Sequence, residues 1–95
     1  MLNRFHVIAP NGKKVSAVWA DEDKTILQTW SGNRKRWESF PISHAELSEE
    51  CVLDMVTEKR RIINKAGNKI EFSDGTVYAK QSHTGLFRKV KTFVL

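Results

Sequence analysis

Closely spaced turn signals divide the first 42 residues into short segments that favour β-structure. Pro10-Asn11-Gly12-Lys13 contains an Asn-Gly pair, which readily takes the positive φ angles of hairpin turns. The polar run at 21–24 and Ser31-Gly32-Asn33-Arg34 mark two further connections. Connections this short join antiparallel neighbours, so residues 1–42 are expected to form a four-stranded meander. The expected strands cover 2–9, 15–20, 25–30 and 35–40.

Apolar residues alternate within these strands. Phe5, Val7 and Ala9 would share one face of the sheet, and the second strand repeats the pattern with Val15, Ala17 and Trp19. One face of the meander should therefore be buried, and the other partly exposed to solvent.

A capped helix is expected over 43–66. Ser43 and Glu46 fit a capping box, and Ile42 and Leu47 stand where a hydrophobic staple would place them. Apolar residues then recur at helical spacing, and Gly67 followed by Asn68 is a plausible end. The alternative is that residues 58–64 and 69–72 form two strands around a turn, which would end the helix near Val56.

The C-terminal segment 69–95 favours strands. Residues 69–72 and 76–80 flank Ser73-Asp74-Gly75, which predicts a hairpin, and 87–95 alternates as a last strand would. The expected fold class is α+β, an antiparallel meander or partly open barrel with one capped central helix and a C-terminal hairpin. A chain of 95 residues is expected to form a single domain.

Neither a membrane span nor a signal peptide is apparent, because no apolar run approaches the roughly 20 residues that a bilayer requires. A lone cysteine, Cys51, forms no internal disulfide and agrees with a reducing compartment. A cytoplasmic protein with no membrane partner and no cofactor is expected.

Charge is segregated along the chain. Five acidic and no basic residues occupy 46–58, and nine of the sixteen Lys and Arg follow at 59–95. A polarised basic surface points to a polyanionic partner, most simply DNA or RNA.

Basic residues form three clusters, and the first lies beside two tryptophans. Cationic groups neutralise phosphates, and an exposed Trp offers a surface on which a base can stack. A cross-strand Trp pair is equally a structural device that closes a small core. The sequence alone does not show whether the three clusters converge in space. The candidate nucleic-acid-binding residues are Trp30, Arg34, Lys35, Arg36 and Trp37, then Arg60, Arg61 and Lys65, then Arg88, Lys89 and Lys91.

Catalysis and metal binding find little support. His6, His44 and His83 are far apart in the sequence, and one cysteine cannot supply a Cys-x-x-Cys zinc knuckle. The glycines form neither a phosphate-binding loop nor a dinucleotide motif. The protein is therefore expected to have no catalytic or metal-ligating residues.

The four short strands, with Gly12-Lys13-Lys14-Val15 after the first and Trp19 closing the second, resemble a small Tudor- or KOW-type β-barrel. Such barrels bind nucleic acid, ribosomal or polymerase surfaces, or modified peptides, so the resemblance implies a binding module.

Two functions are thus compatible with the sequence. The first is a non-catalytic nucleic-acid-binding accessory domain that uses phosphate contacts and an exposed Trp. The second is a protein-interaction module, such as a small inhibitor or adaptor of a nucleic-acid-processing complex. A phage-encoded protein is one form of this second hypothesis. The module would use the acidic block at 46–58 or an open strand edge.

Overall fold

The computed structural model describes residues 4–91 of the chain. This part contains nine strands and two short helical segments. The helical segments are the 3-10 helix η1 (Ile42–His44) and the helix α1 (Glu49–Leu53). The strands are β1 (Phe5–Ile8), β2 (Lys14–Trp19), β3 (Leu27–Ser31), β4 (Arg36–Phe40), β5 (Glu46–Leu47), β6 (Ile62–Ala66), β7 (Lys69–Phe72), β8 (Val77–Lys80) and β9 (Phe87–Lys91).

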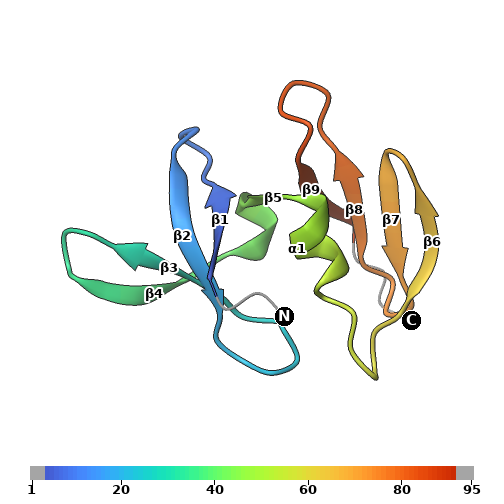
Figure 1. The fold of residues 1–95 in the computed structure, drawn as a ribbon, viewed down its shortest axis with the longest axis horizontal. Helices are drawn as coiled ribbons and strands as arrows, with labels where there is room; N and C mark the ends of the chain where they lie inside the picture. Colours follow the sequence, from blue (N-terminus) through green and yellow to red (C-terminus); the bar gives the residue numbers. More distant parts are fainter. Residues whose placement is uncertain (1–3, 92–95) are drawn as a thin grey trace.

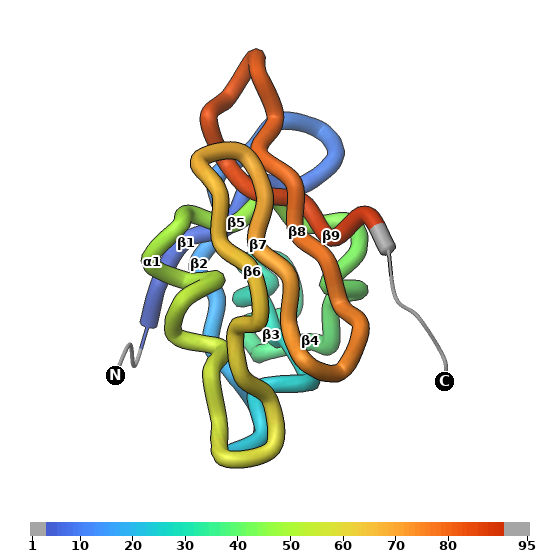
Figure 2. Tube along the Cα trace, turned by 90° about the vertical axis from the view of Figure 1, so that its right-hand side faces the viewer, coloured from blue at the N-terminus to red at the C-terminus, as the bar shows by residue number. Residues whose placement is uncertain are grey.

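All nine strands belong to one antiparallel sheet in the order β4-β3-β2-β1-β5-β9-β8-β7-β6. The two-residue strand β5 joins two groups of four strands, because it pairs with β1 on one side and β9 on the other. Figure 1 shows β1 to β4 on the left and β6 to β9 on the right, with β5 and α1 between them. Turned by 90°, β6 to β9 lie across the near side of the molecule (Figure 2).

The first four strands form the meander that the turn signals predict. Phe5 pairs with Ala17, and Thr29 pairs with both Ala17 and Glu38. At the first turn Gly12 takes a φ of +82°, and its N–H donates to the carbonyl of Ala9 at 2.8 Å. The expected burial of one face is confirmed: Phe5, Val7, Ala17 and Leu27 are all buried on it.

One hydrophobic cluster runs through both groups of strands. It includes Val7 and Leu27 from the first group, and Phe72 and Phe87 from the second. The segment between them supplies Ala45, Leu47, Cys51, Val52 and Met55. The two groups therefore share a core centred on β5 and α1.

The long helix expected over 43–66 is wrong. The helix spans only Glu49–Leu53, and its N-cap is Ser48, whose Oγ accepts a hydrogen bond from the N–H of Cys51 at 3.2 Å. Ser43 lies in η1 and caps nothing, and Glu46 is in strand β5. Ile62 and Ala66, placed on the helix by their spacing, are the two ends of β6. The alternative of two strands around a turn is the one that forms, with the first strand at Ile62–Ala66 instead of 58–64 and the second at Lys69–Phe72.

The second group of strands is a meander as well. β6 pairs with β7 and β7 with β8, the latter around Asp74 and Gly75, and β8 pairs with β9. The strand expected over 87–95 is observed as Phe87–Lys91, and positions 92–95 lie outside the described residues.

A closed barrel of the Tudor or KOW type does not form within residues 4–91. Strands β4 and β6 are the two ends of the strand order, so the sheet is open. The first four strands do not close into a barrel. The edge of β1 that does not pair with β2 pairs with β5, so the sheet continues with β5 and β9. None of the helices described is long and apolar enough to cross a bilayer.

Candidate nucleic-acid interface

The β3–β4 hairpin carries the first basic cluster at its tip. Ser31 and Arg36 are the last paired residues, and positions 32–35 form the turn between them. Gly32 and Asn33 suit such a turn, and the N–H of Arg34 donates to Ser31 Oγ at 3.3 Å. Lys35 takes a φ of +53°, a left-handed conformation. The turn thus places three consecutive cationic side chains at an exposed end of the sheet.

The two arginines of the tip share one carboxylate. Arg34 and Arg36 are 65% and 63% exposed at their side chains and lie 2.7 and 3.3 Å from Glu38 Oε2. The hydrogen bond from Arg34, with the contribution of Arg36, holds the pKa of Glu38 below its usual range. Three positive charges at the tip are therefore opposed by one ionised carboxylate.

An aromatic pair lies on the outer face of the same hairpin. Trp30 and Trp37 are cross-strand partners, with ring centroids 5.5 Å apart and planes at 67°. Leu27 is buried on the core side, and Trp30, three residues further along the strand, has the opposite orientation. Trp30 remains 44% exposed. The pair both closes the hairpin and offers an aromatic surface to solvent.

Arg4 completes this surface, although sequence reasoning missed it. Its guanidinium carbon lies 5.3 Å from the centre of the Trp37 ring, a cation–π contact. Arg4, Ser16, Trp30 and Trp37 together line a hollow of about 220 Å³. A usable signal was present: with Phe5 and Ala17 on the buried face, strand alternation puts Arg4 and Ser16 on the face of the tryptophans.

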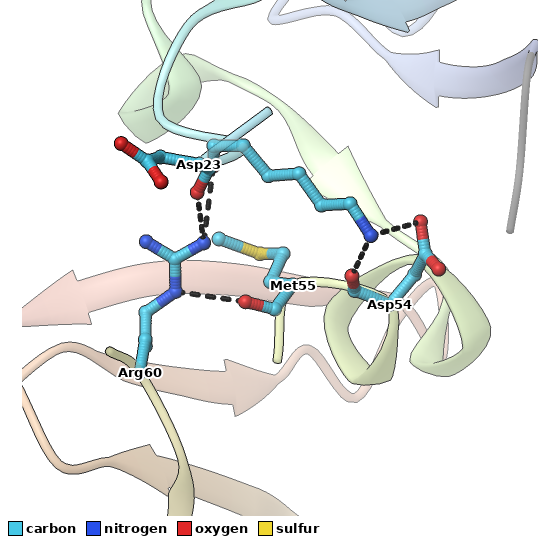
Figure 3. A network of polar contacts seen from close by, with 5 residues as sticks. Asp23, Asp54, Met55 and Arg60 are labelled. Atoms are coloured by element: carbon cyan, nitrogen blue, oxygen red, sulfur yellow. Dashed lines mark hydrogen bonds and ion pairs between the residues drawn. The ribbon is translucent and has the colours of Figure 1, made fainter. Parts of the chain in front are cut away.

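Arg60 lies inside the fold and is not available to a phosphate. It is 8% exposed, and its guanidinium donates to the carbonyls of Met55 at 2.9 Å and Asp23 at 2.6 Å, as Figure 3 shows. Nearby, Lys24 donates to the carbonyl of Asp54, and its ammonium lies 3.1 Å from a carboxylate oxygen of Asp54. Arg60 thus connects the β2–β3 loop to the segment that follows α1.

The remaining candidates do not gather around the hairpin. Lys65 lies on β6, at the opposite end of the strand order from β4, and forms an ion pair of 3.2 Å with Glu49 (Figure 1). Arg61 is exposed just before β6, and Arg88 and Lys89 lie on β9 in the middle of the sheet. The backbone of Lys91 ends β9, and its side chain lies outside the described part of the structure. Among the described residues, the exposed members of the other two clusters therefore lie on or next to other strands than those of the β3–β4 hairpin.

Histidine and carboxylate side chains meet in a second cleft, of about 720 Å³. His44, Glu46, His83, Thr84 and Arg88 contribute to its lining. Glu46 accepts a hydrogen bond from the Thr84 hydroxyl at 2.9 Å and lies 4.0 Å from His83 Nε2. Across residues 4–91, no group of three or more His, Cys, Asp or Glu side chains is arranged to hold a metal ion.

Comparison with protein-family models, with curated proteins and with solved structures finds no match for this chain. Function therefore has to be inferred from the geometry of the hairpin itself.

Proposed function

We propose that this protein is a non-catalytic nucleic-acid-binding accessory domain that acts in the cytoplasm and binds through the tip of the β3–β4 hairpin. The observation that carries the proposal is the joint exposure, on one hairpin, of Arg34, Lys35 and Arg36 beside Trp30. Cations at the tip would neutralise phosphates, and the indole would contact a base or sugar. Arg61, Arg88 and Lys89 remain secondary candidates, because they lie on other parts of the sheet.

The ion pairs within the hairpin leave its cationic side chains available for phosphate binding. Glu38 is shared by two arginines, and both guanidinium groups keep most of their side-chain surface in solvent. Exposed ion pairs contribute little free energy, so a phosphate can replace or join the carboxylate at small cost. Lys35 adds a third charge on the outside of the turn.

The decisive experiment removes the three tip cations together. In Arg34→Ala/Lys35→Ala/Arg36→Ala, affinity for DNA and RNA oligonucleotides should fall, as measured by fluorescence anisotropy across a salt series. Losing three phosphate contacts should reduce the slope of log affinity against log salt concentration by roughly 2 to 3. Unchanged affinity and slope would remove the proposed site.

A matched control keeps the net charge of that variant but changes other positions. Lys13, Lys59 and Lys80 are exposed and lie away from the β3–β4 tip. The triple variant Lys13→Ala/Lys59→Ala/Lys80→Ala should bind more tightly than the tip variant at every salt concentration. Equal losses in the two variants would mean that binding depends only on net charge.

A second candidate function is protein interaction through an open strand edge. The observation that favours it is Ile63 on the edge strand β6, where it is 66% exposed. The acidic block is less suitable as a docking surface, because Asp54 is paired with Lys24 and Glu49 with Lys65. The start of β9 is a poor edge for addition, since Phe87 and Arg88 pair with β5 and the strand pairs with β8 on its other side.

The variant Ile63→Lys separates this candidate from the first. A positive charge on β6 should block strand addition while leaving the β3–β4 hairpin intact. If a defined protein partner is recovered by pull-down with the unaltered chain and lost with Ile63→Lys, the edge is the binding site. Retention of that partner would rule the edge out.

A further inference from the structure

Trp30 is the more exposed indole of the edge-to-face pair on the hairpin. Arg4 already lies over Trp37, whereas Trp30 is 44% exposed and borders the hollow of about 220 Å³. A planar ligand group would therefore meet Trp30 first.

The other walls of the hollow suit a nucleobase. Ser16 supplies a hydroxyl that both donates and accepts hydrogen bonds, and the Arg4 guanidinium supplies donors beside it. Arginine planes and indole rings are the surfaces on which unstacked bases bind, and such stacking tolerates any base. The neighbouring tip cations would hold the phosphates on either side.

We infer that the ligand is single-stranded nucleic acid, with one unpaired base lying against Trp30 in the hollow formed by Arg4, Ser16, Trp30 and Trp37. This inference rests on the proposed function and adds the form of the nucleic acid to it. A base in a duplex is paired and stacked on both faces, so it cannot enter a hollow on a sheet surface without being extruded. A single strand presents its bases at no such cost.

The arrangement argues against a methylated lysine, the cationic ligand that aromatic cages bind. Here the Arg4 guanidinium lies 5.3 Å from the Trp37 centroid and would repel a second positive charge. The hollow is therefore better matched to a neutral planar group flanked by anions.

The test compares three probes of equal phosphate number: a short single-stranded DNA, the same strand made of abasic nucleotides, and a duplex with the same number of phosphates. The unaltered protein should bind the single strand roughly 5- to 150-fold more tightly than the abasic strand, the range that corresponds to one stacked base. Its tryptophan fluorescence should be quenched by the single strand and not by the abasic strand.

Variants at Trp30 assign the effect to the hollow. Trp30→Ala should remove most of the preference for bases, so that its affinities for the single strand and for the abasic strand become nearly equal. Because this change also removes half of the cross-strand pair, Trp30→Phe serves as a second variant that retains an aromatic ring and should retain part of the preference. Ile63→Ala truncates an apolar side chain on β6 that is more exposed than Trp30, and it should alter neither quantity.

Each outcome separates the inference from the proposed function. Equal affinity for all three probes, together with loss of binding in the Arg34, Lys35 and Arg36 variant, would overturn the base site and leave phosphate binding in place. Failure to bind any of the probes would overturn both. Tight binding of a trimethyl-lysine peptide by the same hollow would overturn the inference in favour of a protein ligand.

Discussion

At the scale of single residues, burial determines which cations are available to a ligand. Arg60 and Arg61 are neighbours in the chain, yet the first is buried against backbone carbonyls and the second is exposed. The sequence groups them in one basic cluster, because residue type reports charge and does not report which side chain enters the core. Arg4 has the opposite environment, because it stays exposed and its guanidinium contacts the Trp37 ring, and strand alternation could have placed it on that face.

Arg60→Ala should destabilise the fold by about 2 to 4 kcal/mol, because it leaves the buried carbonyl of Met55 and the part-buried carbonyl of Asp23 without their donor. Urea unfolding measures the loss. Arg61→Ala is the matched control and should stay within about 0.5 kcal/mol, since the bonds of Arg61 to Ser73 use only its backbone. Similar losses in the two variants would contradict the structural role of Arg60.

Glu38→Gln should tighten nucleic-acid binding at neutral pH by removing the charge that Arg34 and Arg36 share. The hydrogen bond from Arg34 keeps the pKa of Glu38 low, so the carboxylate is ionised at neutral pH and becomes protonated only below the usual carboxyl range. The difference in affinity between the two proteins should therefore persist through mildly acidic pH and shrink below it. Anisotropy titrations over a pH series measure this, with the exposed Glu22→Gln as control. Weaker binding by Glu38→Gln would mean that the carboxylate orients the arginines productively.

At the scale of secondary structure, turns were more predictable than the helix. Hairpins of the meander depend on local signals such as Asn11-Gly12, which act within a few residues. The segment 43–66 instead carries apolar residues at a spacing that suits a helix, while its structure is decided by distant partners. Glu46 and Leu47 form β5 because they pair with β1 and β9, and no local sequence pattern predicts a strand of two residues.

The two serines of this segment give a direct test of where the helix begins. Ser48→Ala should cost about 1 kcal/mol of unfolding free energy, because the N–H of Cys51 loses its acceptor. Ser43→Ala should cost only a few tenths, since no side-chain cap forms at η1. Urea denaturation of both variants measures the difference. A larger loss at Ser43 would support the longer helix.

At the scale of the whole molecule, the arrangement of the two meanders depends on pairing between strands that are distant in the sequence. The sequence patterns did not predict this arrangement. The short strand β5 joins the two meanders into one open sheet, and this places β4 and β6 at opposite ends. Because the first basic cluster lies on the β3–β4 hairpin and Lys65 on β6, the same topology separates the clusters. The hairpin part of the candidate site followed from adjacent residues. Its hollow required strand alternation together with the pairing of β1, β2 and β3, since Arg4 and Ser16 come from other parts of the chain.

The shared core also predicts how the molecule unfolds. Trp19, Trp30 and Trp37 all lie in the first meander, so tryptophan fluorescence reports that group, whereas far-UV circular dichroism reports both. Since the hydrophobic cluster is continuous through Leu47 and Val52, the two signals should follow one transition in urea.

Lys24→Met tests the polar link between the first group of strands and the segment that follows α1, because it removes the ion pair to Asp54 and leaves a largely buried carboxylate unpaired. The midpoint should fall for both signals by the same amount, since a shared core transmits the loss to both meanders. The double variant Lys24→Met/Asp54→Asn should recover part of the loss, because the amide leaves no unpaired charge. Two separate transitions, in the unaltered protein or in Lys24→Met, would mean that each meander is stable by itself and that β5 is only a linker.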